Sequence, residues 1–136
     1  MSLITVLQIK KVKMTEEVVE TLKKRKAVRG GHKAYMTTVI ARAIDLMDNY
    51  TMDLESKLKN LKLTVTNRLK IIEQLDESIF MGLTKAEEVA EEIYEAGNYS
   101  ESVSEVLLKI EEVININKPE HFQNTGSGSN TKMGNN

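Results

Sequence analysis

The sequence predicts an all-α protein built around a long, coiled-coil-like antiparallel helical hairpin. Two stretches, about residues 52–80 and 85–116, carry apolar residues at alternating steps of three and four, which is the heptad spacing of packed helices. The chain has one proline and 4% aromatic residues, so little interrupts a helix and a β-sandwich is disfavoured. The link between the stretches is short, which makes neighbouring helices antiparallel.

The apolar stripes of the two stretches are expected to face each other and form the seam of the hairpin. Arg68 and Ser100 fill the polar gaps in the stripes, where they either set the register or mark drift of a straight helix away from a strict heptad. The predicted seam residues are Leu54, Leu58, Leu61, Val65, Ile72, Leu75, Ile79, Val89, Ile93, Val103, Leu107, Ile110 and Ile114.

The ends of the two hairpin helices carry recognisable signals. Gly82 is expected to stop the first helix. Thr84 and Glu87 have the spacing of a capping box and predict the start of the second helix. Gly97-Asn98 falls within the second helix, and the sequence leaves open whether the helix bends, breaks or continues there.

One or two shorter helices are expected before the hairpin. Thr15 is the predicted N-cap of a helix over about residues 15–29, because acidic residues follow it early and basic residues late. Gly30-Gly31 predicts a break or a kink. A helix over about residues 32–49 follows, and its predicted apolar face is Met36, Val39, Ile40, Ala43, Ile44 and Met47.

These elements indicate one helical domain over residues 15–117. Residues 1–14 are interpreted as an N-terminal arm or a short helical extension. Residues 118–136 are rich in Asn, Gly and Ser and nearly free of apolar residues, which predicts a disordered polar tail or linker.

Charge is unevenly distributed along the chain. Residues 10–33 hold nine Lys/Arg and three Glu, a net charge of +6, whereas residues 82–117 hold nine Glu and two Lys, a net charge of −7. Clustered cations attract nucleic-acid phosphates, although no aromatic residues interleave here for base stacking. The alternatives are a solvated helix end or a pairing surface for the acidic stretch. The candidate nucleic-acid contacts are Lys23, Lys24, Arg25, Lys26, Arg29 and Lys33.

Several absences argue against catalysis. The chain has no Cys, and its two His residues lie far apart in sequence, so no metal-binding spacing is present. We therefore expect no enzyme activity, no cofactor, no metal and no small-molecule substrate. The acidic residues of the last helix are expected on its solvent face; these are Glu87, Glu88, Glu91, Glu92 and Glu95.

The order of residues also argues against a membrane or secreted protein. No apolar run approaches the about 20 residues that span a bilayer, and the charges near the start follow the apolar run rather than precede it. We expect a soluble, intracellular protein in the cytoplasm. A nuclear location is left open, because the basic run has the composition of a nuclear-import signal.

The basic run over residues 22–33, followed by a Leu-rich hairpin with a Glu-rich return helix, resembles the N-terminal helical region of Gag-like polyproteins of metazoan long-terminal-repeat retrotransposons of the BEL/Pao type. Residues 25–32 match the basic stretch, residues 54–79 and 89–114 match the hairpin, and residues 121–136 match the linker. The chain departs from a full Gag protein because it lacks a zinc knuckle and a capsid-like portion. It is therefore expected to be a fragment or a truncated form.

The resemblance implies a structural function. The expected function is an assembly module whose hairpin associates with itself, with weak, nonspecific contact to RNA. One alternative is a host coiled-coil adaptor or scaffold that binds the amphipathic helix of a partner. A third hypothesis is a nucleic-acid-binding protein.

Overall fold

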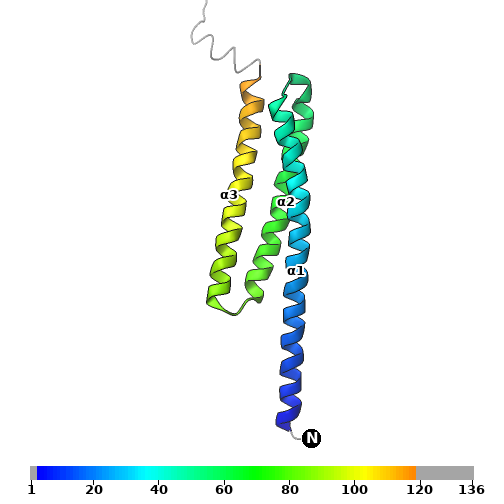
Figure 1. Cartoon of the computed structure of the whole chain (residues 1–136), viewed down its shortest axis with the longest axis vertical. Helices are drawn as coiled ribbons and strands as arrows, with labels where there is room; N and C mark the ends of the chain where they lie inside the picture. The colour runs from blue at the N-terminus through cyan, green and yellow to red at the C-terminus, as the bar shows by residue number, and fades with distance from the viewer. Residues whose placement is uncertain (1–2, 119–136) are drawn as a thin grey trace, which may run out of the picture.

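The computed structural model describes residues 3–118, with side chains described from residue 16 onward. This part of the chain contains three α-helices and no strand, so the all-α prediction is confirmed there. The elements are α1 (Leu3–Asp48), a 3-10 turn η1 (Met52–Leu54), α2 (Glu55–Gly82) and α3 (Ala86–Ile116). The helices run side by side along one long axis, each antiparallel to the one before it (Figure 1).

The prediction of one or two short N-terminal helices is wrong, because α1 is one continuous helix of 46 residues and the longest in the described chain. The helix runs through Thr15, which is therefore not an N-cap, and through Gly30-Gly31 without a break. A mid-helix glycine costs only about 1 kcal/mol relative to alanine. Burial of nearby Met36 and Val39 outweighs that cost.

Of the two interpretations of residues 1–14, an arm or a helical extension, the structure shows the helical extension for residues 3–14. Residues 1–2 lie outside the described part. The predicted polar tail also lies outside it, apart from Lys118, so its disorder stays a prediction.

The hairpin of α2 and α3 has nearly the predicted bounds. Helix α2 ends at Gly82 as expected, and α3 runs without a break through Gly97-Asn98. The predicted capping box is wrong, because the N-cap of α3 is Lys85 and no side chain caps it. Thr84 thus precedes the cap by one residue, where its hydroxyl cannot accept a hydrogen bond from the backbone N–H groups of the first turn.

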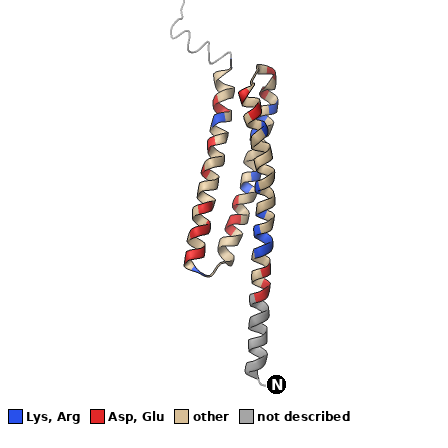
Figure 2. Cartoon of the chain, in the orientation of Figure 1, with Lys and Arg blue, Asp and Glu red and all other residues tan. Residues whose placement is uncertain are grey.

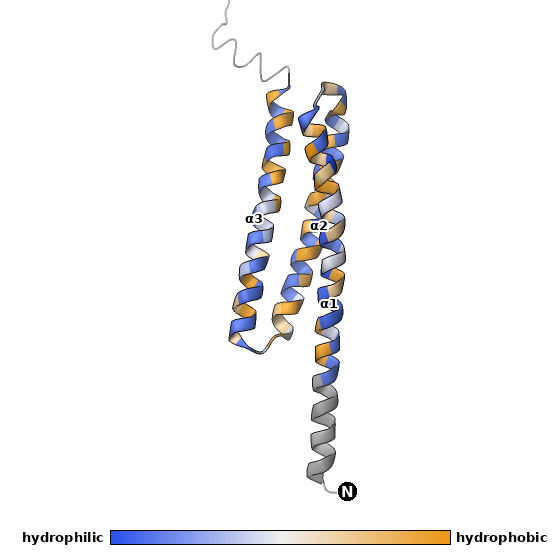
Figure 3. Ribbon diagram, viewed as in Figure 1, coloured by the Kyte–Doolittle hydropathy of each residue, from blue (hydrophilic) through white to orange (hydrophobic). Residues whose placement is uncertain are grey.

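All three helices contribute to the core, which lies where they run alongside one another. One cluster joins Met36 and Val39 of α1 to α2 and to Val103 of α3. A second joins Ala43, Leu58 and Ile110 nearer the other end of the bundle. Figure 3 shows apolar segments recurring along all three helices. The α2 and α3 stripes therefore bury against α1 as well as against each other.

The start of α1 extends past the end of the hairpin. Leu22 lies against Gly82 at the end of α2, and residues 16–20 are all exposed. We call residues 3–20 of α1 the overhang; at ~1.5 Å per residue it is about 27 Å long. In the described chain no other helix lies beside it (Figure 1). No helix within residues 3–118 combines the length and apolar character that crossing a membrane requires.

Candidate functional site

Most of the predicted seam lies in the interior of the bundle. Five residues are half-buried: Leu54, Leu61, Leu75, Val89 and Leu107. Seven are buried: Leu58, Val65, Ile72, Ile79, Val103, Ile110 and Ile114. The seam therefore holds the chain's own fold together, rather than standing open to a second molecule.

Ile93 is the seam residue that the structure contradicts. Its side chain is 52% exposed, and the described residues of α3 before Val103 include no buried side chain. The first turns of α3 therefore pack more loosely than the rest. Ile44 of the predicted N-terminal face is likewise exposed, because it lies at the edge of that face rather than at its centre.

The buried stripe of α2 differs from the predicted one at two places. Leu69 is buried, and Asp76 rather than Leu75 occupies the fully buried position. A straight helix drifts relative to a strict heptad, which moves the stripe by about one residue. Arg68 lies instead on the flank toward α1, where its guanidinium carbon is 4.3 Å from the ring centre of Tyr35.

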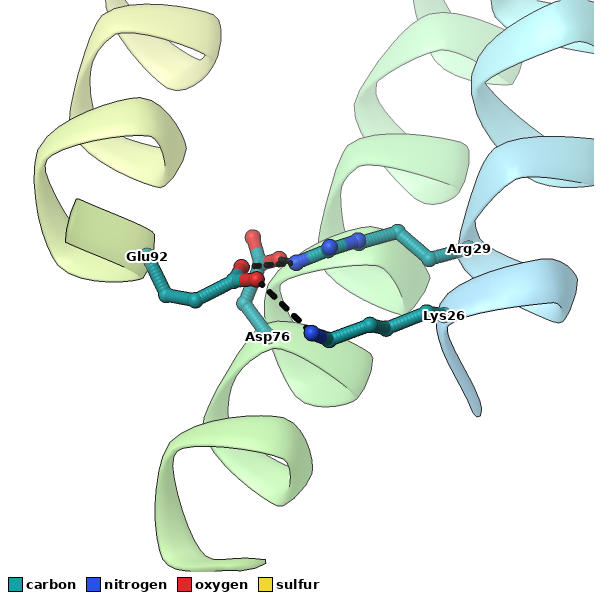
Figure 4. Close-up of polar contacts among 4 residues, drawn as sticks. All are labelled: Lys26, Arg29, Asp76 and Glu92. Carbon is teal, nitrogen blue, oxygen red and sulfur yellow. Dashed lines mark hydrogen bonds and ion pairs between the residues drawn. The ribbon is translucent and has the colours of Figure 1, made fainter. Parts of the chain in front are cut away.

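A buried ionic network joins all three helices (Figure 4). Arg29 Nη1 of α1 lies 2.8 Å from Asp76 Oδ1 of α2 and 2.8 Å from Glu92 Oε1 of α3. Lys26 Nζ lies 3.5 Å from Glu92 Oε2. Charges removed from water need partners of opposite sign. Arg29, Asp76 and Glu92 therefore satisfy one another inside the bundle, and Lys26 pairs with Glu92 from the exposed edge.

Hydrogen bonding tunes the ionisation of this network. Burial disfavours the charged form of Arg29, but its hydrogen bonds to Glu92 and Asp76 outweigh that effect and raise its pKa. The hydrogen bond from Arg29 lowers the pKa of Glu92 despite partial burial, and the charge of Lys26 acts in the same direction. Both groups are therefore held in their charged forms.

The candidate nucleic-acid contacts do not form one open patch. Arg29 is largely buried in the network, and Arg25 donates a hydrogen bond to the Ser78 carbonyl oxygen at 3.3 Å. Lys33 Nζ lies 4.4 Å from the ring centre of Tyr99. The other three candidates, Lys23, Lys24 and Lys26, are exposed, although Lys26 is paired with Glu92.

The acidic residues of α3 are divided between two environments. Glu87, Glu88, Glu91 and Glu95 are exposed as expected, and Figure 2 shows acidic residues recurring along α3. Glu92 contradicts the expectation, because its side chain turns inward to Arg29. Among the residues whose side chains are described, no cluster of His, Asp and Glu could hold a metal ion.

Two surface clefts lie near the hairpin link. One separates α2 from α3 and combines apolar Phe80, Ile93 and Ala96 with carboxylates that include Glu73, which accepts a hydrogen bond from Ser100 at 3.0 Å. We call the other the hairpin-end cleft. It is lined by Glu17, Val18, Thr21, Leu22, Arg25 and Gly82.

Sequence reasoning missed Leu69, Asp76 and the role of Arg29. Leu69, Ile72, Asp76 and Ile79 continue from Val65 in steps of four and three, so the spacing carried a signal. A carboxylate rarely occupies a buried position without a partner, so the sequence alone favours an exposed Asp76 despite this spacing.

Comparison with known protein families, with curated proteins and with solved structures found no match to this chain.

Proposed function

We propose that the chain is a structural assembly module that associates with itself, in a Gag-like protein of a retroelement as the basic stretch and hairpin imply. The overhang carries the proposal. Helix α1 leaves the bundle as a single helix of about 27 Å. In proteins most of the stability of a helix comes from packing of its apolar face against a neighbour, and the overhang lacks that contribution within the described chain.

The amino-acid composition of the overhang gives it low intrinsic helix propensity. Eight of its 18 residues are β-branched and so lose side-chain freedom in a helix: Ile4, Thr5, Val6, Ile9, Val12, Thr15, Val18 and Val19. Val18 and Val19 are exposed within the chain. Intrinsic propensity does not support this helix, so a partner surface would supply the missing stability.

The proposal assigns no catalytic role and no cofactor to the chain. Arg29 and Glu92, whose pKa values the fold shifts, hydrogen-bond each other. They join α1 to α3, and each has the other as its partner. Weak contact to RNA is a secondary role and would fall to Lys23 and Lys24, since the other candidates have partners within the bundle.

The second candidate function is an adaptor that binds the helix of another protein. The cleft between α2 and α3 favours it, because exposed Ile93 and half-buried Phe80 offer an apolar floor flanked by Glu73 and Glu77. Such a floor suits an amphipathic helix with basic edges. The adaptor would be a monomer when alone, which separates it from the first candidate.

Sedimentation velocity and light scattering over a concentration series test the proposal. Dimers or larger species whose population rises through the micromolar range support self-association. A clean monomer at high micromolar concentration would overturn it and favour the adaptor. For the RNA contact, binding that depends on so few cations should disappear as salt rises to physiological strength.

A further inference from the structure

We infer that two copies associate through their overhangs, paired antiparallel about a two-fold axis near Met14. This inference rests on the proposed self-association and identifies its surface. The occupant of each unpartnered overhang is the overhang of a second copy. Three observations support this pairing: the order of charges along the overhang, its length, and the cleft where it meets the hairpin.

The order of charges selects the orientation. Lys10, Lys11 and Lys13 lie in the outer part of the overhang, which has no acidic residue through residue 15. Three acidic residues follow in the inner part: Glu16, Glu17 and Glu20. In an antiparallel pair, the basic part of each copy lies beside the acidic part of the other. A parallel pair would put like charges together.

The length of the overhang determines where each copy ends. With the axis near residue 14, residues 3–7 of one copy come beside about residues 21–25 of the other. The overlap then runs over residues 3–25, about 34 Å, and so covers the whole overhang and the residues next to the end of the hairpin. Both copies use the same surface, so the contact closes as a dimer and leaves no overhang free to add a third copy.

The hairpin-end cleft lies where each overhang would terminate. Val18 and Leu22 give it apolar walls, and neighbouring Met81 is 83% exposed. The first turns of α1 carry Leu3, Ile4, Val6 and Leu7, which are the residues that an apolar cleft accepts. The end of one overhang would therefore cover apolar surface at the hairpin end of the other copy.

Charge reversal tests the pairing. One variant changes Lys10, Lys11 and Lys13 to Glu, and a second changes Glu16, Glu17 and Glu20 to Lys. Each variant alone should weaken dimerisation by more than about tenfold, because every charge then meets its like. An equimolar mixture should restore the dimer. A matched control with Glu87, Glu88 and Glu91 changed to Lys alters the same number of exposed charges on α3 and should leave dimerisation unchanged.

Cross-linking tests the orientation. The chain has no Cys, so Leu7→Cys and Thr21→Cys introduce unique thiols. With a short bis-maleimide, a mixture of the two variants should give dimers joined between positions 7 and 21. Neither variant alone should cross-link efficiently. Efficient cross-linking of each variant with itself would indicate a parallel pair and overturn the inference.

The outcomes separate this inference from the function on which it rests. A wild-type chain that stays monomeric contradicts both. A wild-type dimer that both charge-reversal variants form equally well leaves self-association standing and overturns the overhang pairing. Loss of dimer in each variant alone supports the pairing only if mixing restores it, because a variant that failed to fold could not be rescued.

Discussion

Arg29 Nη1 of α1 lies 2.8 Å from Asp76 Oδ1 of α2, and the two side chains are only 13% and 5% exposed. A buried pair of this kind adds little stability over well-packed apolar residues, but removal of one member leaves a charge without compensation. Since Arg29 also reaches Glu92 of α3, the pair helps to specify which faces of the three helices meet.

The first prediction concerns this pair. Arg29→Met should lower the free energy of unfolding by about 3–5 kcal/mol, because Asp76 would stay buried without its cation. The double variant Arg29→Met with Asp76→Leu should recover most of that loss. Urea unfolding followed by circular dichroism measures both changes. Lys24→Met, at an exposed position of the same helix, is the matched control and should change stability by less than about 0.5 kcal/mol.

The second prediction is a dependence of stability on pH. The folded chain holds the pKa of Glu92 below its ordinary value, chiefly through the hydrogen bond from Arg29. A carboxyl whose pKa falls on folding binds fewer protons in the folded than in the unfolded state. Its contribution is thus fully present above the unfolded pKa of about 4.3 and is lost as pH falls through the lower, folded pKa.

Melting temperatures measured from pH 6 down to pH 3 (an interval that brackets this range) check the effect. Glu92→Gln should lower stability at neutral pH and flatten its decline in acid. Glu91→Gln removes an exposed carboxylate one residue away and should preserve the wild-type profile. A Glu92→Gln profile with an undiminished acid slope would show that other carboxylates govern the acid response.

Heptad spacing predicted the hairpin well, because apolar steps of three and four leave few ways to pack two helices. Val65, Ile72 and Ile110 were predicted and are buried. The contacts of α1 with the hairpin were harder to predict. The spacing of α2 and α3 alone could not show that α1 would share their core. Steps of three and four from Val89 to Val103 pass through Glu92, so its inward position had a signal in α3, but its partner Arg29 on α1 had none.

Glycine was the weakest guide to the ends of helices. Gly82 ends α2, yet Gly30-Gly31 and Gly97 lie within continuous helices. Each costs about 1 kcal/mol relative to alanine, which surrounding contacts can outweigh. The sequence shows the local cost of glycine in a helix, but it does not show how much apolar surface the same helix buries against its neighbours.

The third prediction follows from the space around these glycines. A Cβ added at Gly30, Gly31 or Gly97 would meet no neighbouring atom within 4 Å. Replacement of each by alanine should therefore raise the free energy of unfolding by about 0.5–1 kcal/mol through helix propensity. Denaturant midpoints measure the gain. A loss of stability at Gly30 or Gly31 would indicate a hinge in α1 after all.

Gly82→Ala provides the contrast. Its Cβ would lie 2.7 Å from Leu22 Cδ2, so the leucine must shift away from the end of α2. We expect this strain to cancel the gain in propensity and leave stability near the wild-type value. A gain equal to that at Gly97 would mean that Leu22 does not rest against Gly82.

The fourth prediction separates the two ends of the predicted seam. Ile72→Ala should lower the free energy of unfolding by about 2–5 kcal/mol, because Ile72 is fully buried and its loss leaves a cavity. Ile93→Ala should lower stability by no more than about 1 kcal/mol, since that side chain is 52% exposed. The two substitutions remove the same atoms from helices of one hairpin, so urea unfolding of the pair isolates the effect of burial. Equal losses would mean that Ile93 packs in a seam as deep as that around Ile72, and that the first turns of α3 are not the loosely packed part of the bundle.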